Sequence, residues 1–172
     1  MNQAKIAMAG LALGGTLGMA GTVVSSPTAR AALWAIDGVG LIVATALLAV
    51  KHSREGNDIV ASGFLVFAIG EAIILSGTAA PIEASVPSFG AGVALWSVAL
   101  LLTCAPRNFA IGIRVAGLIG SALFATTSAR IFLGEQVLPI SSPLPFFAYP
   151  FLVFTLAGWI WTLGKQRSPV HE

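Results

Sequence analysis

Apolar residues are gathered along the chain in six long runs, separated by short polar connections. The runs cover residues 6–25, 31–50, 59–79, 88–105, 109–131 and 146–164. Each run approaches the ~20 residues that an α-helix needs to cross about 30 Å of hydrocarbon. The runs are continuous rather than alternating, which argues against membrane β-strands. We therefore predict an all-α integral membrane protein, a bundle of six transmembrane helices that forms one domain over residues 1–172.

Composition supports a bilayer rather than water as the main surroundings of the chain. The sequence is 56% hydrophobic and 9% charged, whereas an average soluble domain is about 25% charged. A soluble chain of this length could not hide so much apolar surface, so the expected partner is the lipid bilayer. The net charge of +2 is small and the basic residues lie at the ends of the runs, so we expect no nucleic-acid partner.

Basic residues are unevenly divided between the two sides of the predicted bundle. If each run crosses once, one side has the N-terminus, the connections after the second and fourth runs, and the C-terminal tail. The positive-inside rule then places both termini in the cytoplasm of a multi-pass plasma- or inner-membrane protein. This side carries Lys5, Lys51, Arg54, Arg107, Lys165 and Arg167, and the opposite side carries Arg30 and Arg130.

The first run leaves two alternatives open. Lys5, followed by an apolar stretch with Gly18 and Ala20 as a small-residue cleavage site, resembles a secretory signal peptide. The other interpretation is a retained first helix. We favour retention because an apolar run of about 19 residues is long enough to span a membrane.

Two carboxylates interrupt the apolar runs: Asp37 in the second and Glu71 in the third. A charge in the bilayer interior costs from about 3 to more than 10 kcal/mol, so such residues face the bundle interior, pair, or mark a functional site. Helical rise places Asp37 about 9 Å and Glu71 about 12 Å from the outer ends of their runs. We therefore expect both acids in the outer half of the bundle, as candidates for binding a proton or cation.

The candidate charge partners are Arg130, near the outer end of the fifth run, and Arg30, seven residues before Asp37. An Arg130–Glu71 or an Arg130–Asp37 pair would stabilise the charged acid. With one arginine for two acids, we expect one acid to remain protonated. Three interpretations stay open for the cluster: a proton- or cation-binding site, a structural ion pair, and a contact with lipid headgroups.

Regularly spaced glycines predict where helices approach closely. Gly10, Gly14 and Gly18 form a doubled GxxxG pattern in the first run, and Gly63, Gly70 and Gly77 share one face of the third. Small residues at these spacings let helix backbones pack against each other. The partner is another helix of the chain or, for the first run, a second copy in a homo-oligomer.

Two further features have alternative interpretations. Trp96 falls near the middle of the fourth run, as a large packing residue or as a side chain that stacks on a ligand. The proline-rich segment 138–150 precedes and enters the sixth run. Prolines disfavour regular helix, so this segment is either a stiff connector or a lid over the acidic cluster.

Missing motifs exclude several classes of membrane protein. The only histidines, His52 and His171, lie in a polar connection and in the tail, so no histidine pair is placed to ligate haem. HExxH, GxSxG and P-loop motifs are absent, and Cys104 is the single cysteine. We expect no cofactor, no metal and no enzymatic activity. Two function classes remain: a proton- or cation-coupled transporter-like unit, and a non-catalytic scaffold or accessory subunit of a larger complex.

Overall fold

The computed structural model describes residues 3–166, and this part of the chain forms six α-helices and no strand. Each predicted run corresponds to one helix, and all six are long and apolar enough to cross a membrane. By length and composition, these helices are compatible with a multi-pass membrane protein. The helices are α1 (Gln3–Val23), α2 (Pro27–Arg54), α3 (Asp58–Gly77), α4 (Val86–Cys104), α5 (Ile111–Phe132) and α6 (Tyr149–Lys165), with a short 3-10 turn, η1 (Phe146–Ala148), before α6.

Helix α2 is longer at both ends than the apolar run 31–50 that predicted it. Pro27 occupies the first turn, where its missing N–H costs no hydrogen bond, and the Ser26 hydroxyl accepts a hydrogen bond of 3.3 Å from the amide of Ala29. At the other end the helix continues through Arg54. His52 therefore lies inside α2 and is buried, not in a polar connection as the sequence predicted. Of the other residues used above, Arg167 and His171 lie outside the described part.

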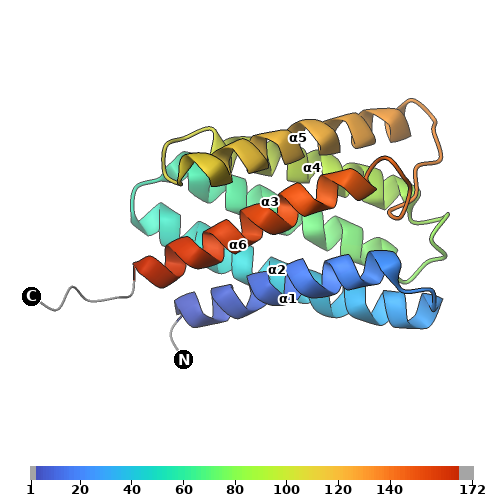
Figure 1. The fold of residues 1–172 in the computed structure, drawn as a ribbon, viewed down its shortest axis with the longest axis horizontal. Coiled ribbons are helices and arrows are strands. Elements are labelled where there is room, and N and C mark those ends of the chain that lie inside the picture. The colour runs from blue at the N-terminus through green and yellow to red at the C-terminus, as the bar shows by residue number, and fades with distance from the viewer. Residues whose placement is uncertain (1–2, 167–172) are drawn as a thin grey trace, which may run out of the picture.

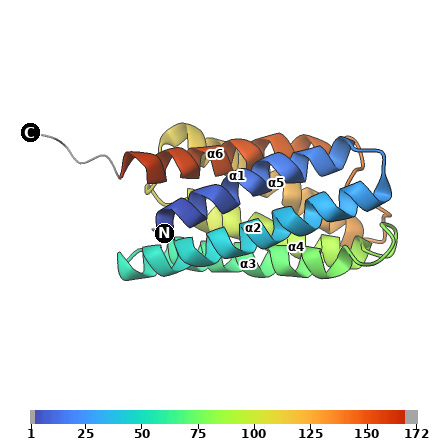
Figure 2. The ribbon, with the colours of Figure 1, turned by 90° about the horizontal axis from the view of Figure 1, so that it is seen from below.

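Neighbouring helices pack in a closed ring, in chain order from α1 to α6 and back to α1. Figures 1 and 2 show them running antiparallel, so α1 begins and α6 ends at the same end of the bundle. We call this the terminal end. The opposite end, which we call the loop end, carries the connections 24–26, 78–85 and 133–145.

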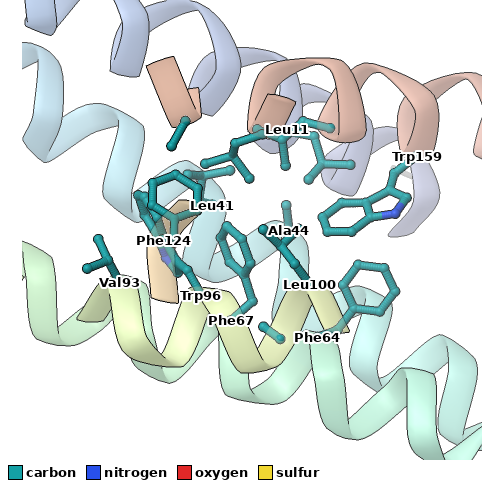
Figure 3. Close-up of a cluster of buried hydrophobic side chains, with 14 of the residues drawn as sticks. Leu11, Leu41, Ala44, Phe64, Phe67, Val93, Trp96, Leu100, Phe124 and Trp159 are labelled. Atoms are coloured by element: carbon teal, nitrogen blue, oxygen red, sulfur yellow. The ribbon is translucent and has the colours of Figure 1, made fainter. Parts of the chain in front are cut away.

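An aromatic cluster fills the centre of the ring. It consists of Phe64 and Phe67 from α3, Trp96 from α4, Phe124 from α5 and Trp159 from α6 (Figure 3). Phe67 and Trp96 stack with ring centroids 5.4 Å apart, and Phe64 meets Trp159 edge-on at 4.7 Å. These are favourable geometries for aromatic pairs. The cluster thus forms part of the packed core at the centre of the bundle.

The predicted glycine faces lie against neighbouring helices of the same chain. A Cβ at Gly10 would collide with the carbonyl of Gly40, and one at Gly14 would collide with Leu41, so this face of α1 is covered by α2. Gly18 faces Asp37, also on α2. The face of α3 lies against α4, with Gly63 against Thr103, Gly70 against Gly92 and Gly77 against Ser88.

Buried hydroxyls join α5 to α4. Ser121 donates a hydrogen bond of 2.7 Å to the carbonyl of Ser97, and Ser128 donates one of 3.0 Å to the carbonyl of Gly90. Hydrogen bonds of this kind between helices add about 0.5–2 kcal/mol each in a membrane. Helices α1 to α5 therefore pack closely in chain order, and α6 makes fewer contacts with its neighbours α5 and α1.

Candidate functional site

A cavity of about 410 Å³ opens into the bundle from the loop end. Its walls come from α1, α2, α3, α4 and α6, while α5 does not contribute. The cavity is lined mainly by apolar side chains and contains both acids that the sequence singled out, Asp37 and Glu71. The connections at the loop end contribute Glu83 and Pro139 to its mouth.

Asp37 and Glu71 are both buried. Asp37 belongs to α2, and the side chain of Glu71 reaches from α3 to the same stretch of α2. Only 8% of Asp37 and 3% of Glu71 is exposed. Asp37 packs against α1 at Gly18, where a Cβ would lie 2.9 Å from its Oδ2. Glu71 reaches from α3 to Gly38 of α2, where a Cβ would lie 3.2 Å from its Oε1. Glycine at these two positions gives the carboxylates room, and the two acids are close enough to repel each other when both are charged.

Two buried carboxyl oxygens of the cavity wall lack a hydrogen-bond partner, Oδ1 of Asp37 and Oε2 of Glu71, and the buried Nε1 of Trp96 faces the carboxyl of Glu71. Within residues 3–166, no lysine, arginine or histidine forms an ion pair with either acid. Buried polar groups in proteins are almost always partnered. The cavity therefore presents two carboxyl groups as acceptors to whatever occupies it.

Arg130 does not pair with either acid. Its guanidinium binds Glu135, with Nη2 at 2.6 Å and Nε at 2.8 Å from Oε2. This pair lies on the surface of the loop end, where Arg130 holds the pKa of the Glu135 carboxyl below its usual value. The expected Arg130–Glu71 and Arg130–Asp37 pairs are therefore both wrong, because a nearer acid outside the apolar runs takes the guanidinium.

Arg30 lines the cavity but is bound to backbone, not to Asp37. It donates from Nε to the carbonyl of Gly21 at 3.2 Å and from Nη2 to the carbonyl of Val24 at 2.7 Å. These carbonyls lie at the C-terminal end of α1, where the helix dipole favours a positive charge. The guanidinium also lies 5.9 Å from the ring centre of Trp34. Its expected role as a charge partner is thus replaced by a cap on the preceding helix.

Two aromatic residues of the site were not identified as such from the sequence. Tyr149 lines the cavity, and its hydroxyl donates a hydrogen bond of 2.8 Å to the carbonyl of Pro139. This bond ties the proline-rich segment to the first turn of α6. Trp34 lines the cavity as well, with Nε1 bound to the carbonyl of Gly18 at 3.2 Å. Both residues lie near the start of an apolar run, where aromatic side chains are typical of the membrane interface. Trp96 stacks on Phe67, as the packing interpretation expects, and its side chain also lines the cavity.

A second, smaller pocket of about 80 Å³ lies at the terminal end. Its wall includes His52 and Trp159, whose Nδ1 and Nε1 atoms are also buried without a hydrogen-bond partner. His52 stacks on Phe64 with centroids 5.4 Å apart. The aromatic cluster thus separates two polar pockets, a large acidic one at the loop end and a small one at the terminal end.

Neither a metal site nor a similarity to a known protein identifies the function of this cavity. Within the described part of the chain, no group of three or more histidine, cysteine, aspartate or glutamate side chains is placed to hold a metal ion. No protein-family model, curated protein or solved structure matches the chain.

Proposed function

We propose that the protein is a small membrane transporter-like unit whose Asp37 and Glu71 bind a proton or a cation. One observation carries the proposal: two buried carboxyls line the same cavity, and no basic side chain of residues 3–166 forms an ion pair with them. Intramembrane acids in a bundle interior are a hallmark of ion and proton pathways. A scaffold would need no such cavity.

Electrostatics favours a bound positive charge between these acids. An ionised carboxylate in low-dielectric surroundings is costly unless it is paired, and two neighbouring carboxylates raise that cost further. A proton or a cation bound in the cavity would lower this electrostatic cost. The two ligands would then compete for the same oxygens, which is the minimum requirement for coupling the movement of one to the other.

The arrangement of the cavity suggests how such coupling would work. The cavity is lined by the connections of the loop end, and the aromatic rings of Phe67 and Trp159 lie between it and the pocket at the terminal end. Access from the other side therefore needs a rearrangement of the helices. The positive-inside rule predicts that the terminal end is cytoplasmic, so the described state is open to the outer side.

The protonation of the two acids is the direct test. Infrared difference spectra of reconstituted protein, recorded over a pH series, should show a carboxyl stretch that is lost on raising the pH. Glu71→Gln and Asp37→Asn should each remove part of that signal. Glu55→Gln and Asp58→Asn, which change exposed acids, should leave it intact.

A pH gradient across proteoliposomes supplies the second arm of the test. The wild type should release protons inside the vesicles, and Asp37→Asn and Glu71→Gln should each reduce this release. That result supports transport. If both acids stay ionised over the whole series and both variants merely lose thermal stability, the acids are structural and the scaffold interpretation replaces this one.

A further inference from the structure

We propose that the cavity takes an organic cation, an amine or quaternary ammonium group that carries apolar substituents. This inference rests on the proposed function and names the class of its ligand. It follows from four properties of the cavity: the charge of its wall, the apolar and aromatic character of the wall, the small number of oxygen ligands, and the volume.

The charge of the wall favours cations. Asp37, Glu71 and Glu83 line the cavity, and Arg30 is the basic residue among its lining. That arginine is already bound to the carbonyls of Gly21 and Val24. It is therefore not free to clamp an anion, and the acids are left without a counter-ion.

The rest of the wall favours an apolar body. Phe89, Leu41 and Leu152 are buried side chains of the lining, at 3%, 2% and 5% exposure. Trp34, Trp96 and Tyr149 add aromatic rings to the same wall. Aromatic faces attract ammonium groups, by about 2 kcal/mol when the contact is desolvated. The wall thus matches both parts of a cation with apolar substituents.

Inorganic cations fit this wall poorly. A hard cation such as Ca²⁺ or Mg²⁺ needs about six oxygen ligands at short distance. The buried part of the wall offers two carboxyl groups, and no metal-ligand cluster exists among residues 3–166. An organic cation needs no such shell, because its charge is spread and its substituents are already apolar.

The size of the cavity points the same way. Its volume of about 410 Å³ lies within the range of roughly 300–1,000 Å³ that is usual for small-molecule sites. A single metal ion or proton would leave almost all of it unused. A ligand of benzylammonium size or larger would reach from the acids to the aromatic rings.

The test measures binding of benzyltrimethylammonium to the purified full-length chain in a neutral detergent, by titration calorimetry with protein-free micelles as the blank. The matched probe is neopentylbenzene, in which carbon replaces the charged nitrogen. We expect the cation to bind at least about tenfold more tightly than its neutral isostere. Equal affinity for the two probes would overturn the proposal, because the cavity would then be selecting for apolar shape alone.

Variants locate the charge that is recognised. Asp37→Asn and Glu71→Gln should each weaken binding of the cation about tenfold, whereas Asp58→Asn and Glu55→Gln should not. If a cavity variant fails to fold, acidification of the wild type gives the same information, since protonated acids should release the probe. Binding that ignores both pH and the variants would overturn the site.

The ammonium group could belong to a free solute or to a lipid headgroup, and competition separates these sources. Short-chain phosphatidylethanolamine added to the micelles should displace the probe if the ligand is a headgroup, with phosphatidylglycerol as the control. No displacement supports a free solute. If the probe does not bind at all while Glu71 still titrates in the infrared spectra, the ligand class is wrong and the proposed proton site stands.

Discussion

At the scale of single residues, Glu71 shows how the bundle tolerates a buried acid. The side chain is 3% exposed, and Oε2 has no hydrogen-bond partner. A buried acid that held two helices together would need a basic partner, and removing one member of such a pair costs about 3–5 kcal/mol. Glu71 has no such partner within the described chain.

We therefore expect Glu71→Gln to leave the stability of the protein nearly unchanged, within about 1 kcal/mol, because an amide of the same shape replaces an unpaired carboxyl. Thermal unfolding in detergent would measure the effect. The same change should abolish proton release in vesicles. A fall of several kcal/mol in the free energy of unfolding would instead show that Glu71 has a structural role.

Gly70 is a second residue whose environment makes a sharp prediction. A Cβ at this position would lie 2.9 Å from the carbonyl oxygen of Gly92 and 2.9 Å from Cβ of Leu95. Gly70→Ala should force α3 and α4 apart and lower the free energy of unfolding by about 1–3 kcal/mol. Gly112→Ala is the matched control, since a Cβ there meets nothing within 4 Å. The control should be neutral or stabilising by up to about 1 kcal/mol, and equal losses in both variants would contradict the close approach.

At the scale of whole elements, two helix ends are capped in the same way by an arginine of a later helix. Arg30 is the fourth residue of α2 and binds carbonyls at the end of α1. Arg114 is the fourth residue of α5 and donates to the carbonyls of Cys104 and Ala105 at 2.9 Å each, at the end of α4. Each guanidinium thus satisfies two carbonyls that have no partner inside their own helix and fixes the angle between consecutive helices.

Arg114→Gln should therefore cost about 1–3 kcal/mol of stability, because a charged cap with two hydrogen bonds is lost. Arg114→Lys should recover part of it, since lysine keeps the charge but lacks the planar fork. Arg107→Gln, an exposed arginine in the same connection, is the control. Thermal unfolding of the three variants would reveal the order, and a lysine variant as unstable as the glutamine variant would argue against a charge effect.

At the scale of the whole molecule, the two ends of the ring differ. The acidic cavity opens at the loop end, and the aromatic cluster and a pocket of only about 80 Å³ lie toward the terminal end. A transporter-like function therefore gives the orientation in the membrane a direct consequence, because it decides which compartment the acids face in this state.

Cysteine labelling of cells that express the protein would determine that orientation. Glu83→Cys, at the mouth of the cavity, should react with a membrane-impermeant maleimide in intact cells. Glu55→Cys, at the terminal end, should react only after the cells are made permeable. The natural Cys104 is fully buried, so the wild type should give little background. The reverse pattern would place the cavity on the cytoplasmic side.

Much of this architecture could be predicted from the sequence, because apolar runs of membrane length leave little freedom. The six helices follow the six runs, with shifts of a few residues where a cap such as Ser26 or a polar helix end such as Arg54 extends α2. The sequence also predicted that Asp37 and Glu71 lie in the same half of the bundle, and both line the cavity. The two lie at similar heights on antiparallel neighbours, and burying them is cheaper than exposing them to lipid.

The partners of the arginines could not be predicted, since they depend on local turns and on helix crossing angles. Gly134 adopts a φ of 95°, and this turn brings Glu135 back to Arg130. Arg30 reaches carbonyls of α1 only because α2 packs closely along that helix. Tyr149 enters the site through η1 and the path of residues 133–145, for which no periodic pattern exists.

The placement of the tryptophans gives the cavity an optical signal of its own. Trp34 and Trp96 line the cavity, Trp159 lies in the aromatic cluster, and Trp161 is 54% exposed on the outside of the bundle. Indole emission shifts in wavelength with the polarity around the ring, so filling the cavity should change the light from two of the four residues. Occupancy could then be followed in unlabelled protein, in real time, by its own fluorescence.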